Sequence, residues 1–180
     1  MLSVRSWREW FWLLLVMSTS TFADWKPLTA DSVHDPAAPA LNLLQPPEDA
    51  LSVLPPDGAG NKVNWVEALR QGHISPRTNI FPETKIEVLD LDIYFDQTAD
   101  LRIVRFPHRP HTEWLDCVNC HDQIFKRGRG VNEFGMYSIL EGEFCGQCHG
   151  AVAFPLTECD RCHSVPREEY EKIQKATTPQ

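Results

Sequence analysis

The sequence predicts a mostly irregular and α-helical fold with one small β-hairpin. Seven prolines fall within residues 24–62, and the alternation typical of strands is convincing at only one place, around residues 85–106. The pattern Cys-x-x-Cys-His occurs three times within residues 104–165, which leaves little chain between copies for regular structure. We therefore divide the chain into residues 1–23, 24–62, 63–103, 104–165 and 166–180.

The first 23 residues have the features of an export signal. Two arginines precede an apolar stretch over residues 11–17, and Ala23 is a small residue suited to cleavage before Asp24. The apolar stretch is short for a membrane span, which takes roughly 20 residues. An uncleaved membrane anchor is the alternative, because two tryptophans beside this stretch suit a membrane interface. We expect a cleaved signal and a periplasmic or otherwise exported protein.

The regular elements that follow are short. Residues 24–62 predict an extended, proline-rich linker. Residues 64–72 predict a helix, since Asn64 can cap its start, Glu67 stands three positions later and Gly72 can end it.

Strands are predicted at residues 85–95 and 101–106, and together they form the only convincing hairpin. A helical stretch is expected over residues 134–141. The C-terminal tail, residues 166–180, predicts a small surface helix that is polar all round and frays.

The repeated pattern is typical of covalent attachment of c-type haem. Its two thiols bond to the vinyl groups of the porphyrin, and the adjacent histidine binds the iron. Three copies use every cysteine of the chain, and covalent attachment outside the cytoplasm agrees with export. Neither a disulfide framework nor a zinc module needs a histidine after each pair. We expect three covalently bound haem c groups, attached through Cys117, Cys120, Cys145, Cys148, Cys159 and Cys162, with iron ligands His121, His149 and His163.

About 60 residues around three haems are too few for an ordinary apolar core. We therefore expect the porphyrins themselves to form the core of residues 104–165. The side chains expected around them are aromatic or aliphatic: Phe106, Trp114, Leu115, Ile124, Phe125, Phe134, Tyr137, Phe144 and Phe154.

Four further histidines can supply the opposite, sixth ligands: His34, His73, His108 and His111. The last two lie three residues apart in Phe-Pro-His-Arg-Pro-His. At this spacing the two side chains point in related but distinct directions, so they can serve two different irons. The alternative is a pair of surface histidines near a proline-rich turn.

Residues 104–111, followed by the three motifs, resemble the cytochrome c7 type, small trihaem periplasmic cytochromes related to the tetrahaem class III proteins. The resemblance covers about residues 104–165 and implies a haem-cored class III module. It further implies that His108 ligates the haem on the first cysteine pair and His111 the haem on the second. Residues 63–103 resemble, less specifically, the leader of larger members of this group.

The third haem departs from this pattern. Family members place a histidine four residues before the second motif, where this chain has Glu141. Met136 is the only methionine after the signal, and some similar domains use a methionine there. Met136, His73, His34 and an open position all remain candidates, and Met136 can also serve as a gap filler. A thioether ligand would raise the potential of that haem.

The sequence favours an electron carrier. Nine residues separate His149 from Cys159. Because an extended chain spans at most about 3.5 Å per residue, this short connection keeps the second and third porphyrins close together. No arrangement typical of catalysis accompanies the motifs, so we expect a periplasmic cytochrome that relays electrons between redox partners. The alternative is a redox enzyme subunit or small-ligand sensor with an open position on the third haem.

Charge limits the partners. The formal net charge is −8 for the whole chain, and cleavage of the signal makes it about −9. This acidity argues against nucleic acid and anionic membranes as partners. A redox protein with a basic docking face is expected instead.

Overall fold

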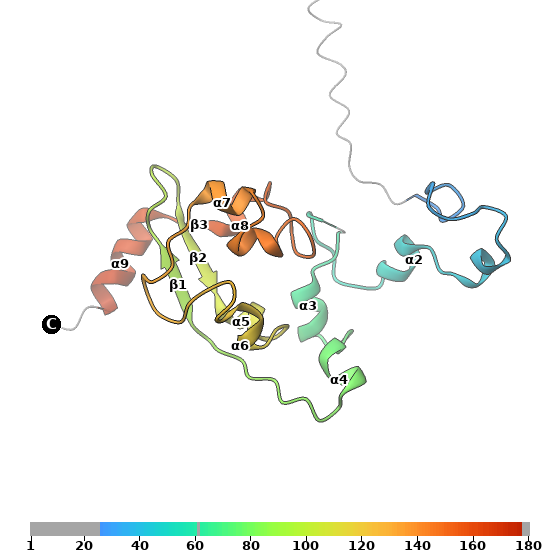
Figure 1. Ribbon diagram of the computed structural model, residues 1–180, viewed down its shortest axis with the longest axis horizontal. Helices are drawn as coiled ribbons and strands as arrows, with labels where there is room; N and C mark the ends of the chain where they lie inside the picture. Colours follow the sequence, from blue (N-terminus) through green and yellow to red (C-terminus); the bar gives the residue numbers. More distant parts are fainter. Residues whose placement is uncertain (1–25, 61, 178–180) are drawn as a thin grey trace, which may run out of the picture. The chain divides into compact units, whose positions relative to one another are not determined.

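A computed structural model describes residues 26–60 and 62–177 of the chain (Figure 1). The chain separates into two compact units, Met1–Val53 and Leu54–Gln180. The predicted signal, residues 1–23, lies outside the described residues. None of the helices within residues 26–60 and 62–177 combines the length and the apolar character that crossing a membrane requires.

Short elements joined by irregular chain dominate both units, as predicted. The first unit contains the 3₁₀-helix η1 (Pro39–Leu43) and α2 (Pro47–Leu51), each starting with proline. Because proline fixes φ near the helical value and needs no N–H partner there, it suits a helix start. The second unit contains α3 (Trp65–Arg70), α4 (Pro76–Ile80), β1 (Asp92–Phe95), β2 (Ile103–Pro107), α5 (His108–Thr112), α6 (Cys117–Cys120), α7 (Met136–Leu140), η2 (Phe144–Gln147), α8 (Cys159–Cys162), β3 (His163–Val165) and α9 (Arg167–Thr177).

The helix predicted over residues 64–72 is α3. The Asn64 side chain accepts a hydrogen bond from the Glu67 N–H at 3.1 Å, as a cap should. Gly72 ends the helix with φ of 77°, and the next residue, His73, donates its N–H to the Ala68 carbonyl at 3.0 Å. The capping box is not completed, because the Glu67 carboxylate accepts from the Gln71 side chain instead.

A three-stranded antiparallel sheet in the order β1-β2-β3 organises the second unit (Figure 1). The predicted hairpin is confirmed in shortened form, with Ile93 opposite Phe106 and Phe95 opposite Val104. The third strand was not predicted: β3 pairs with the start of β2, placing His163 opposite Val104. Three residues are too few to show a strand period in the sequence.

The apolar core lies between this sheet and α9. Ile103, Val165 and Tyr170 are buried together, and Tyr94 and Ile173 pack against them. The predicted tail is therefore corrected: α9 is not polar all round, because Tyr170 and Ile173 face the sheet. The Tyr170 hydroxyl also donates to Asp96 Oδ2 at 3.3 Å, which joins the helix to the hairpin.

The end of the proline-rich segment folds with the second unit. Pro56 pairs with Val63 as an isolated bridge, and the Asp57 N–H donates to the Lys62 carbonyl at 2.8 Å. Ala59 and Val63 are buried. This turn leads into α3 and fixes the position of Asp57.

Candidate haem-binding site

Each Cys-x-x-Cys-His motif forms one tight helical turn, on α6, η2 and α8. In all three copies the backbone N–H of the histidine donates to the carbonyl of the first cysteine. This bond closes the turn and holds the histidine directly after the cysteine pair. The three motifs thus share one local geometry.

The cysteine thiols of different motifs lie near one another. Burial raises the pKa of the Cys145 thiol to about 11, and the neighbouring thiols Cys162 and Cys120 raise it further. Burial likewise raises the pKa of Cys120, with a smaller contribution from Cys148. The influence of one thiol on another shows that the three motifs converge on one region, and the raised values keep these thiols protonated at neutral pH.

Five histidines share one hydrogen-bonding arrangement. In each, ring nitrogen Nδ1 lies within hydrogen-bond distance of a backbone carbonyl oxygen. Because a carbonyl oxygen only accepts, Nδ1 must carry the proton, and Nε2 keeps the lone pair that can bind a metal. The pairs are His108 with Leu91 at 2.9 Å, His111 with Pro107 at 2.7 Å, His121 with Phe125 at 2.8 Å, His149 with Phe154 at 3.3 Å and His163 with Arg102 at 3.0 Å.

The other two histidines are held differently. The Nε2 atom of His73 lies 3.1 Å from the Gln71 amide oxygen, so the nitrogen that is left bare in the other five is occupied here. His34 belongs to the first unit, where its Nδ1 lies 2.6 Å from Asp31 Oδ2.

The rings of His111 and His149 lie close together, at an interplanar angle of 65°. Their ring centroids lie 6.2 Å apart. An imidazole nitrogen binds a transition metal at about 2 Å, so two imidazoles on opposite sides of one metal ion place their centroids about 6 Å apart. Burial lowers the pKa of both histidines, which keeps them in the neutral form that binds metal. This pair therefore fits two axial ligands of a single iron.

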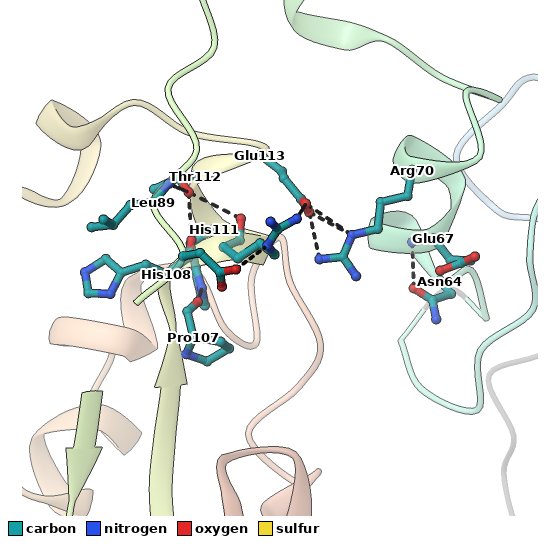
Figure 2. A network of polar contacts seen from close by, with 11 residues as sticks. Asn64, Glu67, Arg70, Leu89, Pro107, His108, His111, Thr112 and Glu113 are labelled. Carbon is teal, nitrogen blue, oxygen red and sulfur yellow. Dashed lines mark hydrogen bonds and ion pairs between the residues drawn. The ribbon is translucent and has the colours of Figure 1, made fainter. Parts of the chain in front are cut away.

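The two histidines of α5 are oriented from both sides. Phe106, at the end of β2, packs against the His108 and His111 rings with centroids 4.9 and 4.4 Å away. Behind them, Thr112 Oγ1 donates to the His108 carbonyl at 2.9 Å and accepts the Leu89 N–H at 3.0 Å (Figure 2). Thr112 is the one residue between 104 and 164 that protein atoms bury.

Ion pairs connect the helices before the sheet to the helices of the site. Arg70 of α3 donates to both carboxylate oxygens of Glu113, at 3.2 and 3.0 Å (Figure 2). Arg77 of α4 pairs with Asp116, which directly precedes the first motif, and donates to the Thr112 carbonyl at 3.3 Å. The region before residue 104 thus helps to position α5 and α6.

The comparisons with known proteins agree with this geometry. A family model described as cytochrome c7 and related cytochrome c matches residues 104–164. This segment is a cytochrome c7-type domain. Neither the curated proteins nor the solved structures contain a match to the chain. The resemblance drawn from the motifs is confirmed over these residues, and membership of this family implies covalently bound haem c and a role in electron transfer.

Within residues 26–60 and 62–177, no three side chains of His, Cys, Asp or Glu gather as a metal site. Structural zinc takes four such ligands, whereas a haem iron needs only axial ones.

The third motif of the c7-type domain is tied to the turn around Asp57. Arg161 forms an ion pair with Asp57, and its guanidinium lies over the Phe154 ring at 5.2 Å from the centroid. Phe154 in turn packs on His149 with centroids 4.3 Å apart. The Arg161 hydrogen bond is the main reason why the pKa of Asp57 is lowered, so this pair stays ionised at neutral pH.

Met136 and Glu141 stand at the two ends of α7, which confirms the predicted helical stretch in shortened form. Met136 is the first residue of the helix and is 46 % exposed. Glu141, at the position where family members have histidine, is the C-terminal cap. The role of Met136 as a ligand stays a prediction.

Four phenylalanines pack on one another rather than singly. Phe134 stacks on Phe144 at 4.9 Å and contacts Phe95 and Phe125 edge-on at 5.2 and 5.8 Å. Three of them were expected around the porphyrins; Phe95 comes from β1 and was not.

Sequence reasoning missed the groups that orient the histidines. Thr112 stands four residues after His108, where a helical threonine can bond back to the earlier carbonyl, so that signal was available. The backbone carbonyl groups of Leu91 and Arg102, which accept from His108 and His163, gave no sequence signal, because every residue has a backbone carbonyl group.

Proposed function

We propose that the exported chain is a periplasmic trihaem electron carrier, with one haem c on each of its three motifs. The observation that carries this proposal is the shared arrangement of five histidines, whose Nδ1–H groups donate to backbone carbonyls and leave Nε2 bare. Such outer hydrogen bonds fix the ring orientation of metal-binding histidines and make them better donors to the metal.

The ligand sets follow from these positions. We assign His121 and His108 to the haem on Cys117 and Cys120. His149 and His111 are assigned to the haem on Cys145 and Cys148, which their 6.2 Å separation supports. The haem on Cys159 and Cys162 takes His163 and Met136; Met136 is the only methionine among the described residues.

The low burial of the domain supports haem as its core. Only Thr112 is buried between residues 104 and 164, although the segment carries many aromatic side chains. A segment of this size needs another source of buried apolar surface, and porphyrins provide it. Of the predicted linker, residues 24–62, only the part before Leu54 would act as a proline-rich linker, because the turn around Asp57 folds with the second unit.

Haem would supply one-electron redox chemistry, and the side chains that bind its iron would set the ligand orientation and the reduction potential. The carbonyl groups that accept from the five histidines hold the imidazoles in one orientation, so little rearrangement accompanies a change in iron charge. Two histidine ligands give a lower potential than histidine with methionine, so the third site would be the most oxidising.

Two of the proposed haem sites would lie at opposite ends of β2, within range of electron hopping. His163 lies opposite Val104 at the start of β2, and His108 and His111 follow its last residue. A five-residue strand spans roughly 15 Å. Electrons entering at one end of β2 would therefore cross the domain in short steps.

Charge supports a redox protein with a basic docking face as one partner, since the chain carries a net charge of −8. Export through a cleaved signal at residues 1–23 gives a periplasmic protein, and retention of these residues would give a membrane-anchored one. Nucleic acid is not a partner in this proposal.

The test is haem stoichiometry followed by carbon monoxide binding. Exported protein should keep a haem stain on a denaturing gel and contain three haems per chain. The absorption spectrum of the ferrous protein should not change under carbon monoxide, because each iron has two protein ligands. A carbon monoxide complex at full haem content would contradict the carrier and support the alternative, an enzyme subunit or ligand sensor with an open third site.

A further inference from the structure

Residues 126–130, called the basic loop below, are positively charged in a chain that is acidic as a whole. The loop contains Lys126, Arg127 and Arg129, and nowhere else in the sequence do three lysines or arginines fall within five consecutive residues. Every residue of the loop is exposed. The whole chain carries a net charge of −8, so this is a local departure from the overall field.

The start of the basic loop is tied to Asn132. This side chain bonds both backbone groups of Lys126: the Lys126 N–H donates to Asn132 Oδ1 at 2.8 Å, and Asn132 Nδ2 donates to the Lys126 carbonyl at 2.9 Å. Gly130 has φ of 73°, and a Cβ on Gly128 would lie 3.2 Å from the Val131 side chain. The backbone at the start of the loop is therefore ordered before a partner binds.

The positive charges of the loop are largely uncompensated. Arg127 Nε lies 3.7 Å from Asp122 Oδ2, a long ion pair at the surface. Among the described residues, Lys126 and Arg129 have no acidic side chain within ion-pair distance. Arg161 differs, because Asp57 already neutralises it.

The loop adjoins the first motif. It starts directly after Phe125, whose carbonyl accepts the Nδ1–H of His121 at 2.8 Å. The third motif, which leads into β3 at the opposite end of β2, carries charges of both signs that pair with one another: Asp160 lies 3.9 Å from Arg102, and Glu158 lies 3.6 Å from Arg161. In the described part of the chain, unpaired positive charge therefore adjoins the first motif and not the third.

We propose that the basic loop is the docking surface for an acidic redox partner at the first haem. This inference rests on the proposed electron-transfer function and adds a second partner to the basic one inferred from the net charge. Complementary charge raises the rate of encounter and orients the partner, and salt screens both effects. The negative net charge disfavours nucleic acid and anionic lipid, whose extended charge would meet the acidic remainder of the chain.

The test compares two doubly substituted holoproteins. Lys126→Gln with Arg129→Gln removes two charges from the basic loop, and Lys172→Gln with Lys175→Gln removes two exposed charges from α9 as a matched control. The probes are poly-L-glutamate, whose binding is measured by titration, and hexacyanoferrate(III), whose oxidation of the reduced protein is followed by stopped flow.

At low salt, the loop variant should bind poly-L-glutamate about 10-fold more weakly and react with hexacyanoferrate(III) several-fold more slowly than the control variant. Both differences should disappear at high salt. Equal losses in the two variants, or no loss in the loop variant, would overturn the proposal. Binding of wild-type protein to phosphatidylglycerol vesicles that is lost in the loop variant would overturn it in favour of lipid.

Haem content is measured first on the wild type and both variants. It distinguishes failure of the proposed electron-transfer function from failure of the proposed docking surface. Absence of covalent haem in the wild type would remove the electron-transfer function. A loop variant with full haem and unchanged probe affinity would remove only the docking surface.

Discussion

At the scale of single residues, the bonded ring nitrogen separates His73 from the other histidines, and a backbone carbonyl partner distinguishes five histidines of the second unit. Five donate from Nδ1 to a carbonyl, and all five were predicted iron ligands. The structure holds His73 through Nε2 and places His34 beside a carboxylate in the first unit. This criterion weakens His73 alone among the candidates for the third haem, because His34 also keeps its Nε2 bare; Met136, His34 and an open position remain.

We expect Met136→Ala to remove a His/Met signature from the near-infrared magnetic circular dichroism of the ferric protein. Loss of the thioether should also lower the potential of that haem, by a fraction of the roughly 0.8 V that axial ligands span. Leu140→Ala is the control, because Leu140 lies on the same helix and is also exposed. A spectrum that Met136→Ala leaves unchanged would reject the assignment.

The sequence predicts those residues of the site that belong to short motifs, because the spacing within a motif indicates its chemistry. The cysteine pairs, their histidines and the pair His108 and His111 all belong to short patterns. The carbonyls that orient two of these histidines are distant: Leu91 lies 17 residues from His108, and Arg102 lies 61 residues from His163. Only the strand pairing brings them together, and carbonyl groups have no sequence signature.

At the scale of elements, the second motif depends on a close approach between α7 and η2. Gly142 ends α7 with φ of 88°, and the Glu143 N–H donates to the Ser138 carbonyl at 2.9 Å. The chain then turns directly into η2. A Cβ on Gly146, between the two cysteines, would lie 2.0 Å from the Ile139 carbonyl oxygen.

Gly146→Ala should therefore destabilise the holoprotein, because a backbone carbonyl cannot move aside without separating the two elements. We expect a loss of about 1–3 kcal/mol in the free energy of unfolding, as for other overpacked sites. Gln147→Ala, at the neighbouring exposed position, should have little effect. Thermal unfolding followed by circular dichroism measures both, and equal midpoints would contradict the close approach.

Elements were predictable where their signals are local. Asn64 and Gly72 correctly predicted the start and the end of α3. The alternation of apolar and polar residues correctly located the hairpin. The polar composition of α9 concealed a narrow apolar stripe, because Tyr170 and Ile173 stand among charged residues. The stripe is recognisable only where it packs against the sheet, and the sheet forms by pairing β2 with β3, whose residues are about 60 positions apart.

At the scale of the whole molecule, the folded unit is larger than the cytochrome c7-type segment. The family match begins at residue 104, whereas β1, the Leu89 and Leu91 contacts and the two arginine pairs all come from residues before it. These contacts hold α5, which carries His108 and His111, and α6, which His121 directly follows. Residues 54–103 thus belong to the scaffold of the site.

Two truncations test this dependence. Fusing the export signal to residue 54 removes only the first unit, so haem content, absorption spectrum and thermal midpoint should match those of the full chain. Fusing it to residue 104 removes β1, the carbonyl partners of His108 and His163, and both ion pairs that join Arg70 and Arg77 to the site. This shorter protein should accumulate poorly, or mature with altered low-spin spectra and a strongly reduced midpoint. Full haem content and an unchanged spectrum from residue 104 onward would show that the matched segment folds alone, and that the contacts before it are dispensable.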